Sequence, residues 1–424
     1  MNRRDFLSLL GLIGIGSGLS AYSYQKISVS KYWPDENQFF NPCLKSTLPA
    51  SLAHHEVVLS ALEGIRTTHV WDSHVHLLGL GDSDSGCWVN PKSLQLWHPW
   101  RYLQFQFFLN AACIDTQTDS VDQGYVARLK SLQWGRGAQM MLLAFDYAYN
   151  AKGERLLEHS AFYTPNDYAA ALHRRFPDTF EWIASIHPYR HDSLEALQQA
   201  FATGARGVKW LPAAMGIDPS SPLCDRFYDS LAQLGIPLLC HCGEEQAVGG
   251  MALQNYGNPL LLRSALDKGV KVIIAHCASQ GQNADIDRGP HSAEKANFEL
   301  FSRLMDESHY EGLLFGDISA ITQIHRLAHL DILLIRRDWH PRLLYGSDYP
   351  LPGVIPLVSL KFLQEKNYIT AQQAQVLTQL RYHNSLLFDF VLDRHLRSGA
   401  HFFGPEVFHT RSLWTGIRTI QQWT

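Results

Sequence analysis

Two histidines, His74 and His76, stand two residues apart at the end of a short run that begins at Trp71. Side chains two residues apart on a β-strand point to the same face, so the two imidazoles can converge on one cation. Such a pair also arises by chance. Taken alone it indicates metal binding only weakly, and its partners must come from elsewhere in the chain.

Three later apolar runs also end in a residue that can bind a metal or carry a proton. The runs 237–241 and 270–276 end in His241 and His276, and the run 343–348 ends in Asp348. Strongly polar groups at the ends of apolar segments need partners, so a core role for all of them together is not expected. For His276 the alternative is a hydrogen-bonded histidine that touches no metal.

The elements that must position these residues follow one repeated pattern from about residue 65, a short apolar run followed by a segment of helical period. This alternation predicts a parallel sheet covered by helices, and eight units predict a closed (β/α)8 TIM barrel of the α/β class. The carboxyl ends of barrel strands form one ring, which would make the candidate residues neighbours. The eight expected strands are 69–75, 139–146, 181–187, 207–211, 237–241, 270–276, 312–318 and 343–348.

Several expected helices carry recognisable starts and stops. Thr370 with Gln373 predicts a capping box before the helix that follows the last strand. Asn258-Pro259 predicts the start of a helix over 260–268. Glycines are placed to end the helices expected over 191–204 and 223–235.

The chain therefore divides into four regions. Residues 1–21 are expected to be a twin-arginine signal, and 22–64 a linker and N-terminal extension. The barrel is expected over 65–392, with a long insertion over 77–133 after the first strand that acts as a lid or substrate wall. The tail over 393–424 is mixed and aromatic.

The N-terminus predicts export. Arg3 and Arg4 precede an apolar run from Phe6 to Leu19, which resembles a bacterial twin-arginine signal read by the Tat export machinery. The expected location is the periplasm of a bacterium. The alternative is a short anchor, because no clean cleavage site follows Leu19, and an uncleaved signal is the only membrane contact expected.

Composition excludes some classes of partner. Charged residues make up 18% of the chain and the formal net charge is −4 without long runs of one sign, so no nucleic-acid partner is expected. Seven cysteines cannot all pair, and none shows zinc-ribbon spacing. Cys240 and Cys242 flank His241 on a strand and should point toward the helices as core residues.

Six motifs along the chain resemble those of the amidohydrolase superfamily, in its amidohydrolase-2 branch. The resemblance spans roughly residues 65–390. Besides the first-strand histidine pair, it includes His241-Cys242-Gly243-Glu244, Ala275-His276, Gly346-Ser347-Asp348-Tyr349-Pro350, Gly207-Val208-Lys209-Trp210-Leu211-Pro212 and Arg381-Tyr382-His383-Asn384.

The resemblance implies that one divalent cation, most often zinc, is bound by His74, His76, His241 and Asp348. Such a cation lowers the pKa of bound water and supplies a nucleophile. The implied general base is Asp348. His276 would polarise the substrate carbonyl.

The number of metal ions depends on Lys209. In binuclear relatives a fourth-strand lysine is carboxylated and bridges two metals, and His276 binds the second. The full set of residues is present, so one or two ions are compatible with the sequence. The alternative is an unmodified lysine that binds an anionic substrate or pairs with Glu244.

Weaker candidates line the same ring. His187 and Arg190 end the third strand and could hold a substrate carboxylate, although Arg190 could equally form a surface ion pair. Glu244, with Glu245, follows His241 and is expected to contact substrate or to orient a metal ligand. Asp317 ends the seventh strand and is expected to be structural.

The leading function is hydrolysis of an amide, ester or lactone bond in a small molecule by a metal-dependent hydrolase. The alternative is a non-hydrolytic metal-dependent decarboxylase or hydratase, because some members of the branch use the same ligands for that chemistry. A third hypothesis is an exported metal-binding protein without catalysis, which the presence of a base at Asp348 disfavours.

Overall fold

The computed structural model describes residues 39–45, 48–115, 120–289 and 292–415. The expected twin-arginine signal over 1–21 lies outside the described residues. So do residues 22–38 of the expected linker and residues 416–424 of the expected tail.

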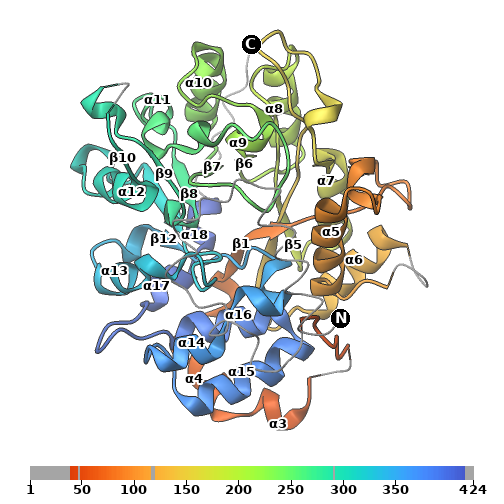
Figure 1. Cartoon of the computed structure of the whole chain (residues 1–424), viewed down its shortest axis with the longest axis vertical. Coiled ribbons are helices and arrows are strands. Elements are labelled where there is room, and N and C mark those ends of the chain that lie inside the picture. The colour runs from red at the N-terminus through yellow and green to blue at the C-terminus, as the bar shows by residue number, and fades with distance from the viewer. Residues whose placement is uncertain (1–38, 46–47, 116–119, 290–291, 416–424) are drawn as a thin grey trace.

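Eight parallel strands form the centre of the described chain, one for each expected strand (Figure 1). All eight are shorter than the sequence pattern predicts. At the first, the expected start is a 3-10 turn over Thr67–His69, so the strand begins two residues later. The strands are β1 (Trp71–His76), β3 (Gln139–Leu143), β5 (Phe180–Ile183), β6 (Val208–Trp210), β7 (Leu238–His241), β8 (Val272–Ala275), β11 (Leu314–Asp317) and β12 (Leu343–Leu344).

These strands close into a barrel through two seams. Regular pairing joins β1, β3 and β5 in one sheet and β12, β11, β8, β7 and β6 in another. Parallel bridges connect the two, Ala184 with Val208 at one seam and Val75 with Tyr349 at the other. The backbone N–H of Lys209 donates to Ala184 O at 2.7 Å across the first seam. The expected TIM barrel is confirmed.

Both faces of the barrel wall are apolar, as expected where helices cover a parallel sheet. On β8, Ile273 and Ala275 pack inside the barrel, whereas Val272 and Ile274 pack in the layer beneath the helices. The same alternation places Cys240 in the outer layer. It therefore turns the neighbouring His241 toward the barrel axis.

Helices surround the barrel, and two of the expected capping signals are confirmed. The Thr370 capping box is present, and Gly235 closes its helix in the left-handed conformation with φ 64°. The helix expected over 260–268 is instead a 3-10 turn followed by one helical turn. The covering helices are α6 (Val121–Ser131), α7 (Asn166–Arg175), α8 (Ser193–Ala202), α10 (Asp225–Leu234), α11 (Arg263–Leu266), α12 (Asn297–Met305), α13 (Leu330–Ile335), α14 (Leu360–Glu365), α15 (Ala371–His383) and α16 (Ser385–His395).

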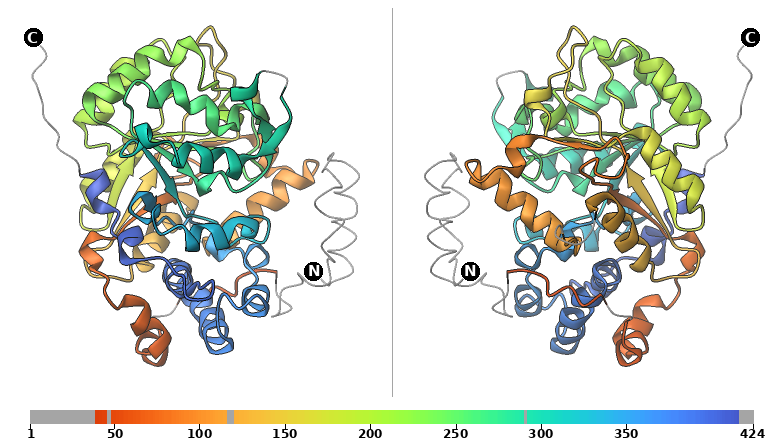
Figure 2. Two further views of the ribbon diagram at one scale, coloured as in Figure 1. Left: turned by 90° about the vertical axis from the view of Figure 1, so that its left-hand side faces the viewer. Right: turned by 90° about the vertical axis from the view of Figure 1, so that its right-hand side faces the viewer.

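The segment expected to be an insertion after β1 contains two different parts. Its second half is α6, which packs into the outer core through Tyr125 and Leu129 and so serves as a covering helix. Its first half holds β2 (Trp88–Val89), the 3-10 turn η3 (Pro91–Leu94) and α5 (Pro99–Ala111). α5 lies at the periphery of the molecule (Figures 1 and 2).

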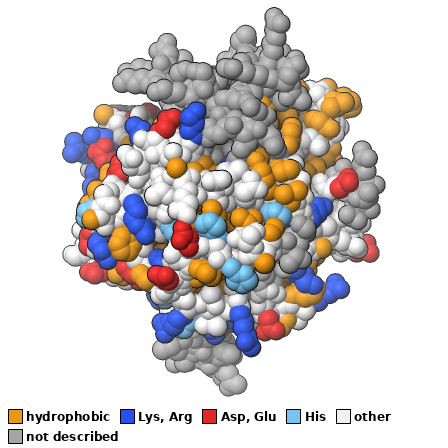
Figure 3. Space-filling model, turned by 90° about the horizontal axis from the view of Figure 1, so that it is seen from below, with side chains coloured by type: hydrophobic (Ala, Val, Ile, Leu, Met, Phe, Trp, Pro, Cys, Tyr) orange, Lys and Arg blue, Asp and Glu red, His pale blue; other side chains and the backbone are white. Residues whose placement is uncertain are grey.

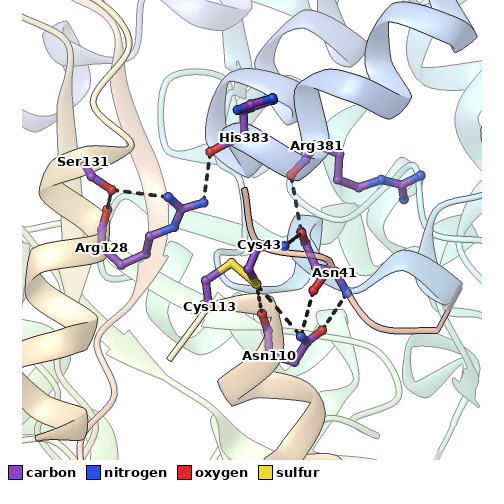
Figure 4. The surroundings of a disulfide bond; sticks show 8 residues. All are labelled: Asn41, Cys43, Asn110, Cys113, Arg128, Ser131, Arg381 and His383. Atoms are coloured by element: carbon purple, nitrogen blue, oxygen red, sulfur yellow. Dashed lines mark hydrogen bonds between the residues drawn. A yellow bond between two sulfur atoms is a disulfide. The ribbon is translucent and has the colours of Figure 1, made fainter. Parts of the chain in front are cut away.

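Residues 39–45 of the N-terminal extension are fastened to the far end of α5. A disulfide joins Cys43 to Cys113 (Figure 4). Beside it, Asn110 Oδ1 accepts a hydrogen bond from Asn41 N at 2.8 Å, and Asn110 Nδ2 donates to Asn41 O at 3.0 Å. This part of the extension is thereby held against the insertion.

The described part of the tail closes the barrel at the end opposite the strand carboxyl termini. Trp414, on α18 (Arg411–Trp414), packs with Trp71 in the cluster that fills the barrel interior. Its indole N–H donates to Ser73 Oγ at 3.0 Å, and Trp71 N donates to Thr410 Oγ1 at 2.9 Å. The remaining short helices are α3 (Ala50–Ala53), α4 (Glu56–Leu62), α9 (Pro212–Met215) and α17 (Pro405–Phe408), and the remaining strands are β4 (Phe162–Tyr163), β9 (Gln282–Ala284) and β10 (Glu294–Ala296).

Within the described ranges, no helix combines the length and the apolar character needed to cross a membrane.

Candidate metal centre

The carboxyl ends of the barrel strands gather the residues expected to bind metal. His74 and His76 come from β1, Lys209 from β6 and His241 from the end of β7. His276 directly follows β8, and Asp348 follows β12. All of these except His76 are buried. The ring that the sequence predicts is therefore a compact cluster of polar groups at one end of the barrel.

The tightest group consists of His74, His76 and Asp348. Asp348 Oδ1 lies 3.0 Å from His76 Nε2 and 3.5 Å from His74 Nε2. One ligand atom from each residue lies within 4.8 Å of the others. Ligand atoms about 2.1 Å from a tetrahedral cation stand about 3.4 Å apart, so these separations fit one small divalent ion.

The tautomer of His74 also fits a ligand. Its Nδ1–H donates to Asp317 Oδ2 at 2.8 Å, because a carboxylate can only accept. This bond leaves the lone pair on Nε2, the nitrogen that faces Asp348. A carboxylate that orients a metal-binding imidazole in this way is a usual feature of such sites.

The surroundings of His241 give independent support for a metal site. Its Nε2 is buried and makes no hydrogen bond, although Glu245 Oε2 lies 3.3 Å away. Buried polar nitrogens normally have a partner. A cation shared with His74 and Asp348 would supply one, although His241 lies outside the groups whose ligand atoms fall within 4.8 Å of one another.

Protonation states in the cluster favour metal binding. Burial lowers the pKa of His74, His241 and His276 well below the usual value, and the neighbouring charges of Lys209 and Arg326 act in the same direction. These imidazoles are therefore neutral near pH 7, the form that binds a cation.

Asp348 is ionised in the same surroundings. Burial opposes its ionisation, but the facing rings of His74 and His76 outweigh burial and hold the pKa of the carboxyl below its usual range. Asp348 also has a left-handed backbone with φ 57°. Such strain in a residue other than glycine tends to occur at functional sites.

Gly346, in the motif at the last strand, lies close against His74. A Cβ added at this position would lie 2.9 Å from the Cβ of His74, closer than side chains tolerate. The motif therefore needs glycine so that His74 can lie directly beside it.

Lys209 lies inside the cluster. Its Nζ is 3.3 Å from His74 Nε2, and burial lowers its pKa. A lowered pKa favours the neutral amine, which is the form that reacts with carbon dioxide. Carboxylation of Lys209 stays a prediction.

His276 lies beside the ligands, with its own support. Its Nδ1 lies 3.0 Å from Ser319 O and 2.8 Å from Ser319 Oγ, and its Nε2 lies 3.9 Å from Asp348 Oδ2. Its backbone N–H donates to Asp317 Oδ1 at 2.8 Å. The backbone of His276 is left-handed, with φ 56°.

Asp317 thus has a more direct part in the site than the structural role expected from the sequence. One of its oxygens holds His74 and the other holds the backbone of His276 and of Ser319. Its position at the end of β11, in the same ring as the ligands, is the sequence feature that could have indicated this role.

Arg326 is a residue of the site that no sequence pattern indicated. It is buried, its Nε has no hydrogen-bond partner, and Nη1 reaches Ser279 Oγ only at 3.4 Å. Its charge interacts with Asp348 and Glu245. It follows the end of β11 by nine residues, in a stretch with no periodic pattern. A buried guanidinium with spare donors can bind an anion.

The candidates from the third strand have their own partners. His187 Nε2–H faces Met215 O at 3.1 Å, and its Nδ1 accepts from Tyr189 N at 3.2 Å. Arg190 donates to Asp146 Oδ2 at 2.9 Å and to Asp192 Oδ2 at 2.6 Å. Neither shares a contact with the histidine cluster.

Of the two glutamates after β7, Glu245 faces His241. Glu244 accepts a hydrogen bond from Gln246 Nε2 at 3.0 Å instead. The loop turns between the two residues. The pairing of Lys209 with Glu244, one of the alternatives from the sequence, is therefore not found. Glu245 is the glutamate beside the ligands.

The family model described as amidohydrolase matches residues 71–386, which contain the whole cluster. The chain belongs to this family. The match lies in the amidohydrolase-2 branch, as the motifs predict. The family consists of metal-dependent enzymes, and the cluster around His74 is the part of this amidohydrolase that can hold the metal.

Solved structures with a similar fold differ strongly from the chain in sequence. One is a TIM-barrel protein from Bordetella bronchiseptica, with 13% identity and a TM-score of 0.44, over 66% of this chain and 86% of that one. Another is a probable 2-pyrone-4,6-dicarboxylic acid hydrolase from Acinetobacter baumannii, with 13% identity and a TM-score of 0.39, over 75% and 97%. A third is 5-carboxyvanillate decarboxylase from Sphingomonas paucimobilis, with 10% identity and a TM-score of 0.42, over 77% and 97%. No curated protein matches the chain.

Proposed function

We propose that the chain is a hydrolase of an amide, ester or lactone bond in a small molecule. In this proposal one zinc ion is held by His74, His76, His241 and Asp348. A bound cation of this kind lowers the pKa of water toward neutrality and polarises a carbonyl oxygen.

The observation that carries the proposal is the placement of Asp348. One carboxylate oxygen lies beside the ligand nitrogens of His74 and His76, and the other faces His276 Nε2 at 3.9 Å. An ionised, buried carboxylate in this position can accept a proton from water and later return it to the leaving group. In the tautomer that carries its proton on Nε2, with Nδ1 facing Ser319 Oγ at 2.8 Å, His276 is placed to donate toward a developing oxyanion.

The test is turnover by the metal-loaded full chain on a panel of lactones, esters and amides, with aromatic carboxylic acids beside them. Hydrolysis of at least one of the first three classes, lost in Asp348→Asn, supports the proposal. Stoichiometric metal binding without turnover of any class would instead support a non-catalytic metal-binding protein.

A matched variant tests His276. Its replacement by asparagine should leave metal content per chain unchanged and lower kcat by about 100-fold, because it removes a group that acts on the transition state. Full turnover in this variant would remove His276 from the mechanism.

We propose one metal ion per chain rather than two. The amine of Lys209 lies beside the ligands, 3.3 Å from His74 Nε2, where an unmodified lysine can bind an anionic substrate. Elemental analysis of the purified chain should find about one equivalent of zinc. Two equivalents, with added mass on Lys209, would establish the binuclear form.

The second candidate function is decarboxylation, and Arg326 is the observation that favours it. Its buried guanidinium near Asp348 is suited to the carboxylate that such a reaction removes. Carbon dioxide release from an aromatic acid without hydrolysis of any ester or lactone would establish this candidate. Arg326→Met should then raise KM for the acid by about tenfold or more.

We also propose that the chain is exported to the periplasm by the twin-arginine route. The disulfide between Cys43 and Cys113 supports this, because disulfides persist in oxidising compartments. Replacing Arg3 and Arg4 by lysine should leave the protein in the cytoplasm, as measured by fractionation. Undiminished export of that variant would refute the route.

A further inference from the structure

An exposed apolar segment lies at the entry to α5 and has no role in the metal centre. Leu96 is 70% exposed and Trp97 75%, with Leu94 at 45% and Trp100 at 46%. Exposed large apolar side chains are ordinary when scattered, but a cluster on one short segment marks an interaction surface. We call Leu94–Trp100 the apolar tip.

The charge of the surrounding sequence indicates the kind of partner. Between Asp84 and Asp115 there is no Asp or Glu, although the chain has 40 of them in 424 residues. The same stretch contains Lys92 and Arg101. By contrast, basic and acidic side chains are interspersed on the face that carries α14 and α15 (Figure 3). A stretch with cations, tryptophans and no carboxylates of its own suits anionic lipid headgroups.

The attachment of the N-terminal extension also supports a membrane partner. The described extension begins beside α5, where Phe40 stacks on Phe107 with ring centroids 5.0 Å apart, and Cys43 is bonded to Cys113. The residues that precede Phe39 contain the apolar run from Phe6 to Leu19. The apolar run therefore precedes a segment that is bonded at the C-terminal end of α5, the helix whose N-terminal end carries the apolar tip.

We propose that the apolar tip docks on the surface of an anionic lipid bilayer. Tryptophan suits this role because its ring is apolar and its N–H stays in the hydrated headgroup layer. Lys92 and Arg101 face the headgroups in this arrangement, and the surface acts in addition to any anchor formed by the N-terminal run. The contact lies close to the barrel mouth, since Gln104 Nε2 donates to Gln246 O at 3.2 Å in the loop after β7.

The test uses the full chain with vesicles of phosphatidylglycerol and phosphatidylethanolamine, some with brominated acyl chains that quench nearby tryptophan. The wild type is expected to bind and to show partial quenching. A variant carrying Trp97→Ser and Trp100→Ser should lose that quenched component and bind at least about tenfold more weakly. Because both proteins keep residues 1–38, the lost quenching reports on the apolar tip alone.

The matched control changes two exposed apolar residues elsewhere, Ile332→Ser and Ile335→Ser, which are 43% and 47% exposed in the wild type. It should bind and quench like the wild type. A second variant, Lys92→Glu with Arg101→Glu, should weaken binding to anionic vesicles more than to phosphatidylcholine vesicles.

Two results would overturn the proposal. One is equal quenching in the wild type and in the Trp97 and Trp100 variant. The other is a dimer in sedimentation experiments that dissociates in that variant, which would make a second copy of the chain the partner.

Discussion

The two ends of the barrel are built from the same eight strands but in opposite ways. At the carboxyl end, buried histidines and carboxylates converge, His276 and Asp348 have left-handed backbones, and His241 Nε2 lacks a partner. At the other end Trp414 fills the interior and its N–H is bonded to Ser73. A barrel thus separates function from stability along its axis. Substitutions at the two ends should separate turnover from folding in the same way.

The largest expected effect is at the carboxyl end. Asp348→Asn should lower kcat/KM by about 1000-fold or more, because it removes both a metal ligand and the base. The free energy of unfolding of the metal-free chain should change little. Steady-state kinetics with denaturant unfolding checks both, and Asp192→Asn at the rim serves as control. A variant that keeps a tenth of the activity would contradict the role of Asp348.

At the opposite end, Trp414→Ala should lower the free energy of unfolding by about 3–5 kcal/mol, because it leaves a cavity in the barrel interior. Metal content and kcat at low temperature should stay as in the wild type. Urea unfolding provides the measurement. Trp97→Ala, at a tryptophan 75% exposed, is the control and should change stability by less than about 0.5 kcal/mol. Loss of metal in Trp414→Ala would break the separation between the ends.

Asp317→Asn tests whether the hydrogen bond that Asp317 accepts from His74 contributes to metal binding. The change weakens the acceptor for His74 Nδ1–H, so zinc affinity should fall by about 10- to 100-fold. Competition with a chromophoric chelator measures it. Unchanged affinity would show that Asp317 is structural, the role that the sequence predicts.

The smallest effect is a change in the free energy of unfolding, and it is expected from a substitution in α16. Asp389 and Asp393 are buried, each has a carboxylate oxygen without a hydrogen bond, and burial raises the pKa of both well above 3.8. As pH rises above 3.8, the unfolded chain releases a proton that the folded chain keeps, so this group lowers stability toward neutral pH.

Asp389→Asn should therefore raise the free energy of unfolding at pH 7 by about 1 kcal/mol, and the gain should vanish near pH 3. Urea unfolding at the two pH values provides the measurement. A gain of the same size at both would mean that it has a cause other than ionisation.

The main elements of the fold were predictable because they depend on local patterns. Buried strands such as β8 read as unbroken apolar runs, and the polar residue that ends each run lies in the ring by the geometry of a barrel. The capping box at Thr370 is likewise local. Where helix formation depended on packing, as over 260–268, the predicted length was too great.

The rest of the site depends on contacts between segments distant in sequence, which no local pattern encodes. Arg326 reaches the cluster from a loop without periodicity, and only the turn after β7 decides that Glu245 rather than Glu244 faces His241. The pairing of Cys43 with Cys113 has the same character, since seven cysteines allow many pairs.

That disulfide has a consequence for proteolysis. It spans 70 residues and encloses both β1 and the apolar tip. An exposed tip is a natural place for a protease to cut, but a single cut there leaves the two fragments covalently joined. A nicked molecule would keep its first strand, with His74 and His76, attached to the barrel. It would separate into two bands in a denaturing gel only after a reductant is added.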